Sequence, residues 1–390
     1  MKSLISDSRA WLRVTRRIAM VAGAVGFASY CSHTISARAR QADGSNGGTE
    51  SRQLGSTPGN AYVGASTCAE CHAGIARIQP ATSMAQAATD PANVGETDKY
   101  RAMEYREGTL TYAVVHSQNG LRFQVSDGNN IASAPIRWIF GAGITGQTFV
   151  LERDGKFYES RASYYSALRN LDLTVGHPRA RPSSITAALG RPLDRAEVAK
   201  CFPCHLSEDI FSGKLEVASA HPGVSCENCH GAGGRHASNE EDSRNRQKYN
   251  DIFDPSTLAP VDINDFCGSC HRTTPDVLAT GIHDIRNIRF QPYRLENSAC
   301  YNPADARITC ISCHNPHRPL DTNLDDYDHD CLACHAGGKI TSAQHAAPKC
   351  PRATHRCASC HMPKIELPGA HYAFTDHYIR VVKPGQPYPG

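Results

Sequence analysis

The chain has 390 residues, of which 40% are hydrophobic and 7% aromatic, and its formal net charge at neutral pH is +3. The first 39 residues hold six basic residues and one acidic residue, a net +5, so residues 40–390 carry the remaining −2. The nominally basic composition of the whole chain therefore argues for neither nucleic acid nor an anionic membrane surface as a partner.

Residues 1–39 have the pattern of a signal peptide. Several arginines precede an apolar run from Ile18 to Tyr30, which is too short for a comfortable membrane span. Ala39 ends an A-x-A cleavage site, so we expect cleavage there and export to the periplasm, the extracellular space or the cell surface. An uncleaved segment that anchors the chain in a membrane is the alternative.

Residues 40–60 are rich in Gly, Ser and Thr, which predicts a flexible linker. Beyond it, a Cys-x-x-Cys-His unit recurs seven times and takes up fourteen of the seventeen cysteines. The first unit lies in residues 61–96 and the other six in residues 177–390. The units are Cys68-Cys71-His72, Cys201-Cys204-His205, Cys226-Cys229-His230, Cys267-Cys270-His271, Cys310-Cys313-His314, Cys331-Cys334-His335 and Cys357-Cys360-His361.

The spacing of each unit has a chemical reason. On one turn of helix, residues i, i+3 and i+4 share a face. Two thiols can therefore bond to the two vinyl groups of one porphyrin edge, while the histidine lies under the ring as the proximal ligand of the iron. Zinc sites and redox dithiols also use Cys-x-x-Cys pairs, but neither requires a histidine after every second cysteine. The pattern is that of haem c attachment and predicts seven covalently bound haems.

The cysteine-free residues 97–176 have a different sequence pattern, that of strands and tight turns. LTYAVVHSQNGLRFQVS and FVLERDGKFYES read as hairpins around Asn-Gly and Asp-Gly turns, and IRWIFGAG reads as an apolar strand. We therefore expect a small antiparallel β module, inserted after the first haem segment.

Residues 177–390 carry six motifs at short spacing, which leaves little room for a conventional apolar core or long helices. The expected fold class is a multihaem cytochrome of helical turns and loops with little regular secondary structure. In this fold the stacked haems form the core, and the β module is an addition to it.

The second axial ligand decides what each haem can do, because an iron with two histidines is closed to substrates and an open iron allows chemistry. His236 follows a flexible Gly-Ala-Gly-Gly stretch, His317 lies three residues after His314, and the others lie close to further motifs. The candidate distal ligands are His236, His317, His377, His371, His221, His345 and His283.

Other residues are weaker candidates for the distal position. His329 and His355 could also serve, and Met84 could cap one haem, although methionine is more often a packing residue. His116 lies in a predicted strand and His177 at the end of the β module, and both are expected to be structural. Cys300 and Cys350 form an even pair in an oxidising compartment, so we expect a disulfide between them, with buried free thiols as the alternative.

The segments HPGVSCENCHGAGGRH, CISCHNPH and CASCHMPK followed by HYAFTDH resemble the multihaem cytochrome c superfamily. This group includes hydroxylamine oxidoreductase, pentahaem nitrite reductase and the tetrahaem cytochrome of nitrifiers. The resemblance covers residues 61–95 and 190–380, and it implies haem pairs whose distal histidines are borrowed across motifs. His236 and His317 match those post-motif histidines.

The chain also departs from these enzymes. It has no Cys-x-x-Cys-Lys motif of the nitrite reductases, and none of its fifteen tyrosines can be assigned the cross-link of hydroxylamine oxidoreductase. The resemblance therefore supports the architecture more than an enzymatic activity. We expect a protein that transfers electrons along mostly bis-histidine haems. The alternative is an oxidoreductase acting on a small nitrogen or sulfur compound at one five-coordinate haem.

The expected partners follow from charge and topology. With seven haems and their propionates, residues 40–390 carry about −9 when all irons are ferric and about −16 when all are ferrous. Such a protein attracts basic redox partners, which would act as electron donor and acceptor. The β module is a candidate docking surface, including one that joins copies of the chain into a homo-oligomer.

Overall fold

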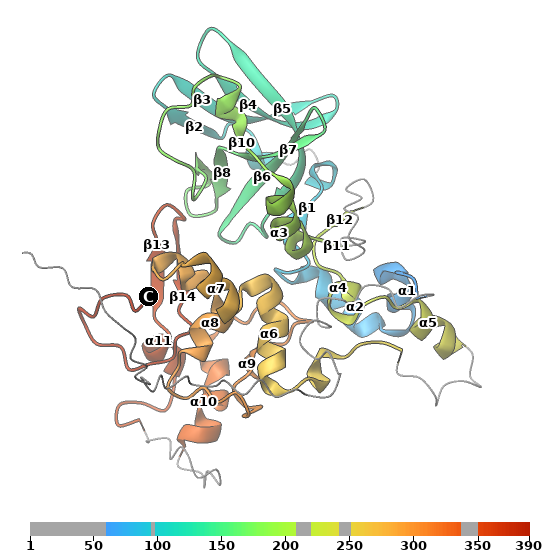
Figure 1. The fold of residues 1–390 in the computed structure, drawn as a ribbon, viewed down its shortest axis with the longest axis vertical. Coiled ribbons are helices and arrows are strands. Elements are labelled where there is room, and N and C mark those ends of the chain that lie inside the picture. Colours follow the sequence, from blue (N-terminus) through green and yellow to red (C-terminus); the bar gives the residue numbers. More distant parts are fainter. Residues whose placement is uncertain (1–59, 95–97, 208–219, 242–250, 337–349) are drawn as a thin grey trace, which may run out of the picture. The chain divides into compact units, whose positions relative to one another are not determined.

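The computed structural model describes residues 60–94, 98–207, 220–241, 251–336 and 350–390, as drawn in colour in Figure 1. The predicted signal peptide, almost all of the predicted linker and the candidate ligand His345 lie outside these residues. No helix among the described residues combines the length and the apolar character needed to cross a bilayer.

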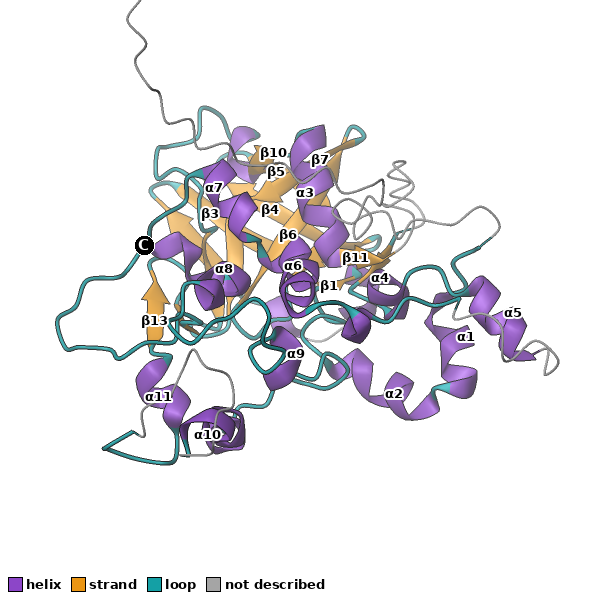
Figure 2. Ribbon diagram, turned by 60° about the horizontal axis from the view of Figure 1, so that its bottom comes forward, coloured by secondary structure: helices purple, strands orange, loops and turns teal. Residues whose placement is uncertain are grey.

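An antiparallel sheet of ten strands is the largest regular element of the described chain (Figures 1 and 2). The main path of neighbouring strands is β10-β7-β6-β5-β4-β3-β2, while β1 pairs with β5, and β8 pairs with both β6 and β9. The strands are β1 (Ala88–Thr89), β2 (Glu104–Glu107), β3 (Leu110–Ser117), β4 (Gly120–Ser126), β5 (Ile131–Phe140), β6 (Gly146–Arg153), β7 (Lys156–Ser160), β8 (Ala162–Tyr165), β9 (Asn170–Leu173) and β10 (Gly190–Pro192).

Sequence alternation explains the central strands. In β3 and β4 every second residue is buried, and their inward side chains join a hydrophobic cluster that includes Tyr112, Phe123 and Phe149. The two predicted hairpins are confirmed, because Ser117 pairs with Gly120 and Arg153 pairs with Lys156. At the second turn Asp154 and Gly155 both have positive φ, as a two-residue type I′ turn requires.

The helices are short, and most of them lie in the part of the chain that carries the cysteine motifs. They are α1 (Gly64–Cys71), α2 (Ala73–Ile78), α3 (Arg195–His205), α4 (Cys226–His230), α5 (Gly234–Glu241), α6 (Pro260–His271), α7 (Thr274–Thr280), α8 (Gln291–Glu296), α9 (Cys310–Cys313), α10 (Asp328–His335) and α11 (Cys357–His361). Two further two-stranded sheets pair β11 (Leu206–Ser207) with β12 (His221–Pro222), and β13 (Lys364–Leu367) with β14 (Tyr372–Thr375).

The predicted fold class is wrong in one respect that matters. A fold with little regular secondary structure does not fit a ten-stranded sheet and eleven α-helices within the described residues. Nor are stacked haems its whole core, because the sheet buries a large hydrophobic cluster of its own. The sheet also extends beyond residues 97–176, since β1 precedes that range and β10 follows it. Strands of two and three residues are too short to show the alternation that identified the others.

Helix α3 is packed directly onto the sheet. Phe202, between the two cysteines of its motif, is fully buried, with its ring centroid 5.3 Å from that of Trp138 and 5.5 Å from that of Phe140. The helix begins with a capping box in which the Asp194 side chain accepts from the Glu197 N–H and the Glu197 side chain accepts from the Asp194 N–H. One Cys-x-x-Cys-His motif is thus part of the hydrophobic cluster on the sheet.

Replacing Phe202 with alanine should lower the free energy of unfolding by about 3–5 kcal/mol, because the change leaves a cavity between aromatic rings. Chemical denaturation of the holoprotein followed by far-ultraviolet circular dichroism measures this. As a control, Leu168→Ala removes a residue that is 44% exposed and should cost far less. Equal losses for the two variants would show that α3 is not anchored through Phe202.

Candidate haem attachment sites and their axial histidines

All seven Cys-x-x-Cys-His units lie on helical turns. Four units lie at the C-terminal end of a longer helix, in α1, α3, α6 and α10. The other three units form the whole of α4, α9 and α11. In the units at Cys68 and Cys310 the histidine is the first residue beyond the helix. Because residues three apart share one face of a helix, the two thiols of each unit lie on the same side, as attachment to one porphyrin edge requires.

Three of the motif histidines are oriented by bonds that suit a metal ligand. The Nδ1–H group donates to a main-chain carbonyl in His205 (Ala87 O, 2.7 Å), His230 (Phe253 O, 2.8 Å) and His361 (Arg380 O, 3.0 Å). A carbonyl oxygen only accepts, so each ring carries its proton on Nδ1 and keeps a lone pair on Nε2. This is the arrangement that orients histidine ligands in metalloproteins, and the residues therefore fit a haem iron.

Three motif histidines also face a second histidine at a separation that fits one iron. A metal–imidazole bond is about 2 Å long. Bonds of about 1.4 Å within the five-membered ring place its centre about 1.2 Å from the coordinating nitrogen. Two imidazoles on one iron therefore have their centres about 6.4 Å apart. The ring centroids lie at 6.4 Å for His72 and His236, 5.9 Å for His230 and His317, and 6.1 Å for His314 and His377.

Burial keeps several of these imidazoles neutral, which ligation requires. Burial is the main cause that lowers the pKa of His377 to about 4, and the nearby His314 lowers it further. Burial likewise lowers the pKa of His205, of His314 and of His317.

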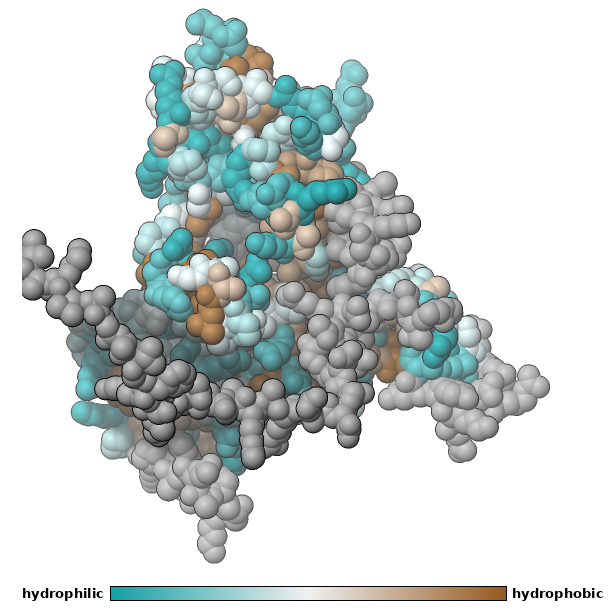
Figure 3. Space-filling view, viewed as in Figure 1, coloured by the Kyte–Doolittle hydropathy of each residue, from teal (hydrophilic) through white to brown (hydrophobic). Residues whose placement is uncertain are grey.

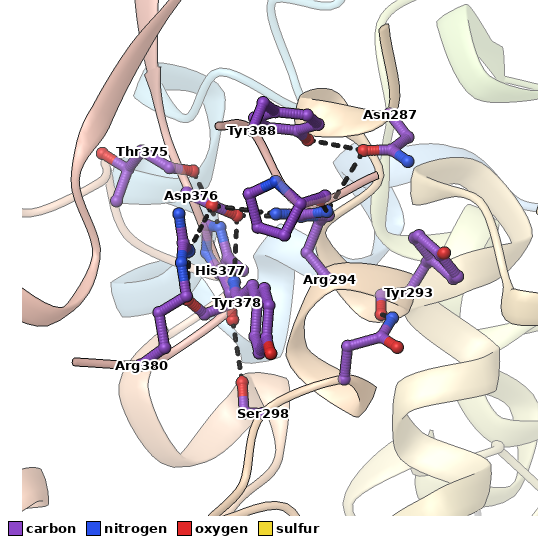
Figure 4. Close-up of polar contacts among 12 residues, drawn as sticks. Asn287, Tyr293, Arg294, Ser298, Thr375, Asp376, His377, Tyr378, Arg380 and Tyr388 are labelled. Atoms are coloured by element: carbon purple, nitrogen blue, oxygen red, sulfur yellow. Dashed lines mark hydrogen bonds and ion pairs between the residues drawn. The ribbon is translucent and has the colours of Figure 1, made fainter. Parts of the chain in front are cut away.

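A buried ion pair holds the segment that carries His377 (Figure 4). The Arg294 guanidinium donates to both carboxylate oxygens of Asp376 at 2.9 Å, and neither side chain is more than 1% exposed. Asp376 also accepts from Arg380 Nη1 at 2.6 Å and from the Tyr378 N–H at 3.0 Å. These bonds fix the backbone on both sides of His377.

The same segment supports a second motif. Arg380, four residues after Asp376, supplies the carbonyl that accepts from His361, and its own N–H donates back to the His361 carbonyl at 3.2 Å. One buried carboxylate therefore helps to orient both the motif histidine His361 and the candidate distal ligand His377. Sequence analysis did not single out Arg294, Asp376 or Arg380, and the only local signal was the place of Asp376 directly before a candidate ligand.

Other predicted ligands are placed differently. The Nε2 atom of His371 lies 2.7 Å from Asp172 Oδ2 on β9, and its ring packs against Tyr165. His221 and His283 are exposed. His329 and His355, the weaker candidates, are exposed as well, and Nε2 of His329 lies 2.8 Å from Asp330. Within the described chain, no group of three or more His, Cys, Asp or Glu residues is arranged to hold a metal ion by itself.

Two histidines expected to be structural and the two cysteines outside the motifs are also placed by the structure. His116 is exposed on β3, and His177 is buried with Nε2 3.1 Å from Glu159. Cys300 and Cys350 are both free thiols, so the predicted disulfide is wrong.

Apolar side chains are exposed next to two of the motifs. Ile75 and Ile78 follow His72 and are 43% and 37% exposed, and Ile311 between Cys310 and Cys313 is 37% exposed. On the face drawn in Figure 3, patches of hydrophobic residues are interspersed with hydrophilic ones. A porphyrin attached at either motif would cover such side chains, which agrees with the proposed use of the cysteines.

Comparison with known proteins gives limited similarity. No protein-family model matches the chain. Over 178 residues, which are 35% of this chain and 52% of the relative, it is 26% identical to multiheme cytochrome MtrA of Shewanella baltica (strain OS185). The chain thus matches about half the length of this curated relative. Among solved structures, the outer cell wall cytochrome OcwA has a TM-score of 0.48 and 14% sequence identity, over 82% of this chain and 80% of that one.

The sequence relationship to a multihaem cytochrome agrees with the repeated motif and with the paired histidines. The more specific resemblance to the hydroxylamine oxidoreductase group stays a prediction. Together these observations support a multihaem c-type cytochrome.

Proposed function

We propose that the chain is an exported heptahaem c-type cytochrome that transfers electrons. The observation that carries the proposal is the set of three histidine pairs, in which a motif histidine faces a second imidazole across a gap that fits one iron. Haem c held at these sites supplies one-electron exchange between ferric and ferrous iron.

Each residue type has a distinct task in this proposal. The fourteen motif cysteines hold the porphyrins, and the seven motif histidines bind the irons from one side. Carbonyls such as that of Phe253 hold the ring orientation and the tautomer of these histidines. The second imidazoles of His236, His317 and His377 would bind the same irons as the motif histidines that they face, and would keep substrates from those irons.

Partners and location are further parts of the proposal. The predicted signal peptide and the relationship to a multihaem cytochrome support export. The acidic charge expected of residues 40–390 with bound haem favours basic redox partners. The ten-stranded sheet is a candidate surface for docking such a partner or a second copy of the chain.

An oxidoreductase with one open iron is the second candidate function. Ring contacts among the described residues assign a second imidazole to three of the seven motif histidines. An open iron at one of the other motifs would allow a small nitrogen or sulfur compound to bind there. A direct spectroscopic measurement separates the two functions.

The decisive measurement is low-temperature electron paramagnetic resonance of the oxidised holoprotein, with haem quantified on the same sample. We expect seven haems per chain and only low-spin ferric signals, because every iron would have two strong axial ligands. A stoichiometric high-spin signal would replace the electron carrier with the oxidoreductase. Fewer than seven covalent haems would contradict the heptahaem proposal.

The His236→Ala variant should convert one of seven low-spin haems to high spin while all seven stay attached, since the thioether bonds do not involve this residue. The same resonance experiment measures the change. His116→Ala, which removes an exposed histidine of β3, is the control and should leave the spectrum unaltered. An unaltered spectrum for His236→Ala would remove this residue from the ligand set.

His377 and His371 lie six residues apart and should behave differently. The His377→Ala variant should produce one high-spin haem, because His377 faces His314. The His371→Ala variant should keep all signals low-spin, because His371 binds Asp172 instead. The opposite result for the pair would mean that the segment 371–377 binds iron through the other histidine.

A further inference from the structure

Five of the seven helices that carry motifs (α1, α6, α9, α10 and α11) have neither a side-chain capping bond at the N-cap residue nor a capping box, and three of these share a further feature. Helices α1, α9 and α11 have eight, four and five residues, and the residues at their N-cap positions, Val63, Thr309 and Arg356, make no side-chain capping bond. The first N–H groups of a helix have no partner inside it and need one elsewhere.

In each case the partner comes from the helix of another motif. Glu227 on α4 accepts from the N–H groups of Val63 and Gly64 at 3.0 and 2.9 Å. Asn264 Oδ1 on α6 accepts from the Cys310 N–H at 3.1 Å. Asp328 on α10 accepts from the Cys357 N–H at 2.8 Å and also from the Arg356 N–H.

The three capping side chains are buried, with exposed fractions of 5% for Glu227, 0% for Asn264 and 7% for Asp328. A buried oxygen that lost these donors would remain without compensation for its desolvation, so each bond constrains both helices. The two carboxylates also lie where the dipole of the capped helix favours negative charge.

The caps also share a place in the sequence. Asn264 and Asp328 each lie three residues before the first cysteine of their own motif, and Glu227 directly follows the first cysteine of its motif. Each cap is therefore within about one helical turn of an attachment point.

The thiols of each capped pair also lie close together: Cys68 beside Cys226, Cys267 beside Cys310, and Cys331 beside Cys357. The thiol of Cys204 on α3 lies beside that of Cys270 on α6 in the same way, although no cap joins those two helices. The attachment edges of two motifs thus meet wherever one motif caps the other.

The helices with local caps provide a contrast. Helix α3 is capped by Asp194 and Glu197, and α4 by Ser225 and Asn228. Helix α3 carries the one motif that takes part in none of the three caps, and it packs on the sheet instead.

We propose that Glu227, Asn264 and Asp328 are positioning residues that join six of the seven attachment helices into three pairs and so set the separation of the two haems in each pair. The inference rests on the proposed haem attachment. Electron exchange between haems depends steeply on their separation, so these side chains act on function without touching an iron.

Glu227 has an additional role in its pair. Its Oε1 atom also accepts from the Gly233 N–H at 2.9 Å, at the start of the segment that leads to His236. The same carboxylate thus binds the start of α1, which leads to His72, and the segment that leads to His236. Asp328 is the cleaner target for a test, because its side-chain bonds to α11 do not involve a candidate ligand.

The test compares Asp328→Ala with Asp328→Asn in the holoprotein, using haem quantification and electron paramagnetic resonance. We expect seven low-spin haems in the wild type and in both variants. Magnetic coupling between the haems at Cys331 and Cys357 should be present in the wild type, lost in Asp328→Ala and retained in Asp328→Asn, since an amide oxygen accepts as that of Asn264 does. Asp262→Ala, which removes an exposed carboxylate from α6, is the matched control and should retain all coupling.

The outcomes separate the two proposals. Fewer than seven haems in the wild type would overturn the proposed function and this inference with it. Seven low-spin haems with coupling unchanged in Asp328→Ala would overturn the inference alone. Should Asp328→Ala yield no holoprotein, Asn264→Ala tests the pair at Cys267 and Cys310 by the same criterion, and unchanged coupling there would equally overturn it.

Discussion

The orientation of an imidazole is the constraint on which the rest of the haem-binding part depends. A histidine that binds a metal through Nε2 is usually oriented by an acceptor for its Nδ1–H group. In this chain the acceptors are carbonyls of Ala87, Phe253 and Arg380, which lie 118, 23 and 19 residues from their histidines along the sequence. Each such bond ties an attachment helix to a distant segment, so the binding sites and the tertiary structure are established together.

Outside the sheet, hydrogen bonds and ion pairs therefore contribute much of the stabilisation. The sheet has an extensive hydrophobic cluster, whereas the cluster around Ile288, Leu367 and Ala370 is small. Beside that small cluster, Arg294 and Asp376 form a buried ion pair. Removing one partner of such a pair leaves an uncompensated buried charge, which typically costs about 3–5 kcal/mol. Its geometry, rather than apolar contact, holds His377 opposite His314.

What the sequence could predict follows the range of the interactions. The Cys-x-x-Cys-His units depend on a single turn of helix, and the hairpins on two-residue turns, so both were readable from local spacing. The choice between His371 and His377 was not, because it depends on Asp172, which is 199 residues from His371 in the sequence. The extent of the sheet was missed for a related reason, since β1 and β10 are recognisable only through the long strands that they pair with.

Helix α3 has a consequence for how the protein is made. Phe202 stands between two thiols and is enclosed by Trp138, Phe140 and Phe157, and Cys201 packs against the same cluster. A half-buried thiol in that position is less accessible to an enzyme that would join it to a vinyl group than a fully exposed one. We therefore expect haem ligation at this motif to precede the packing of α3 on the sheet, so that biogenesis would have an order: ligation first, closure second.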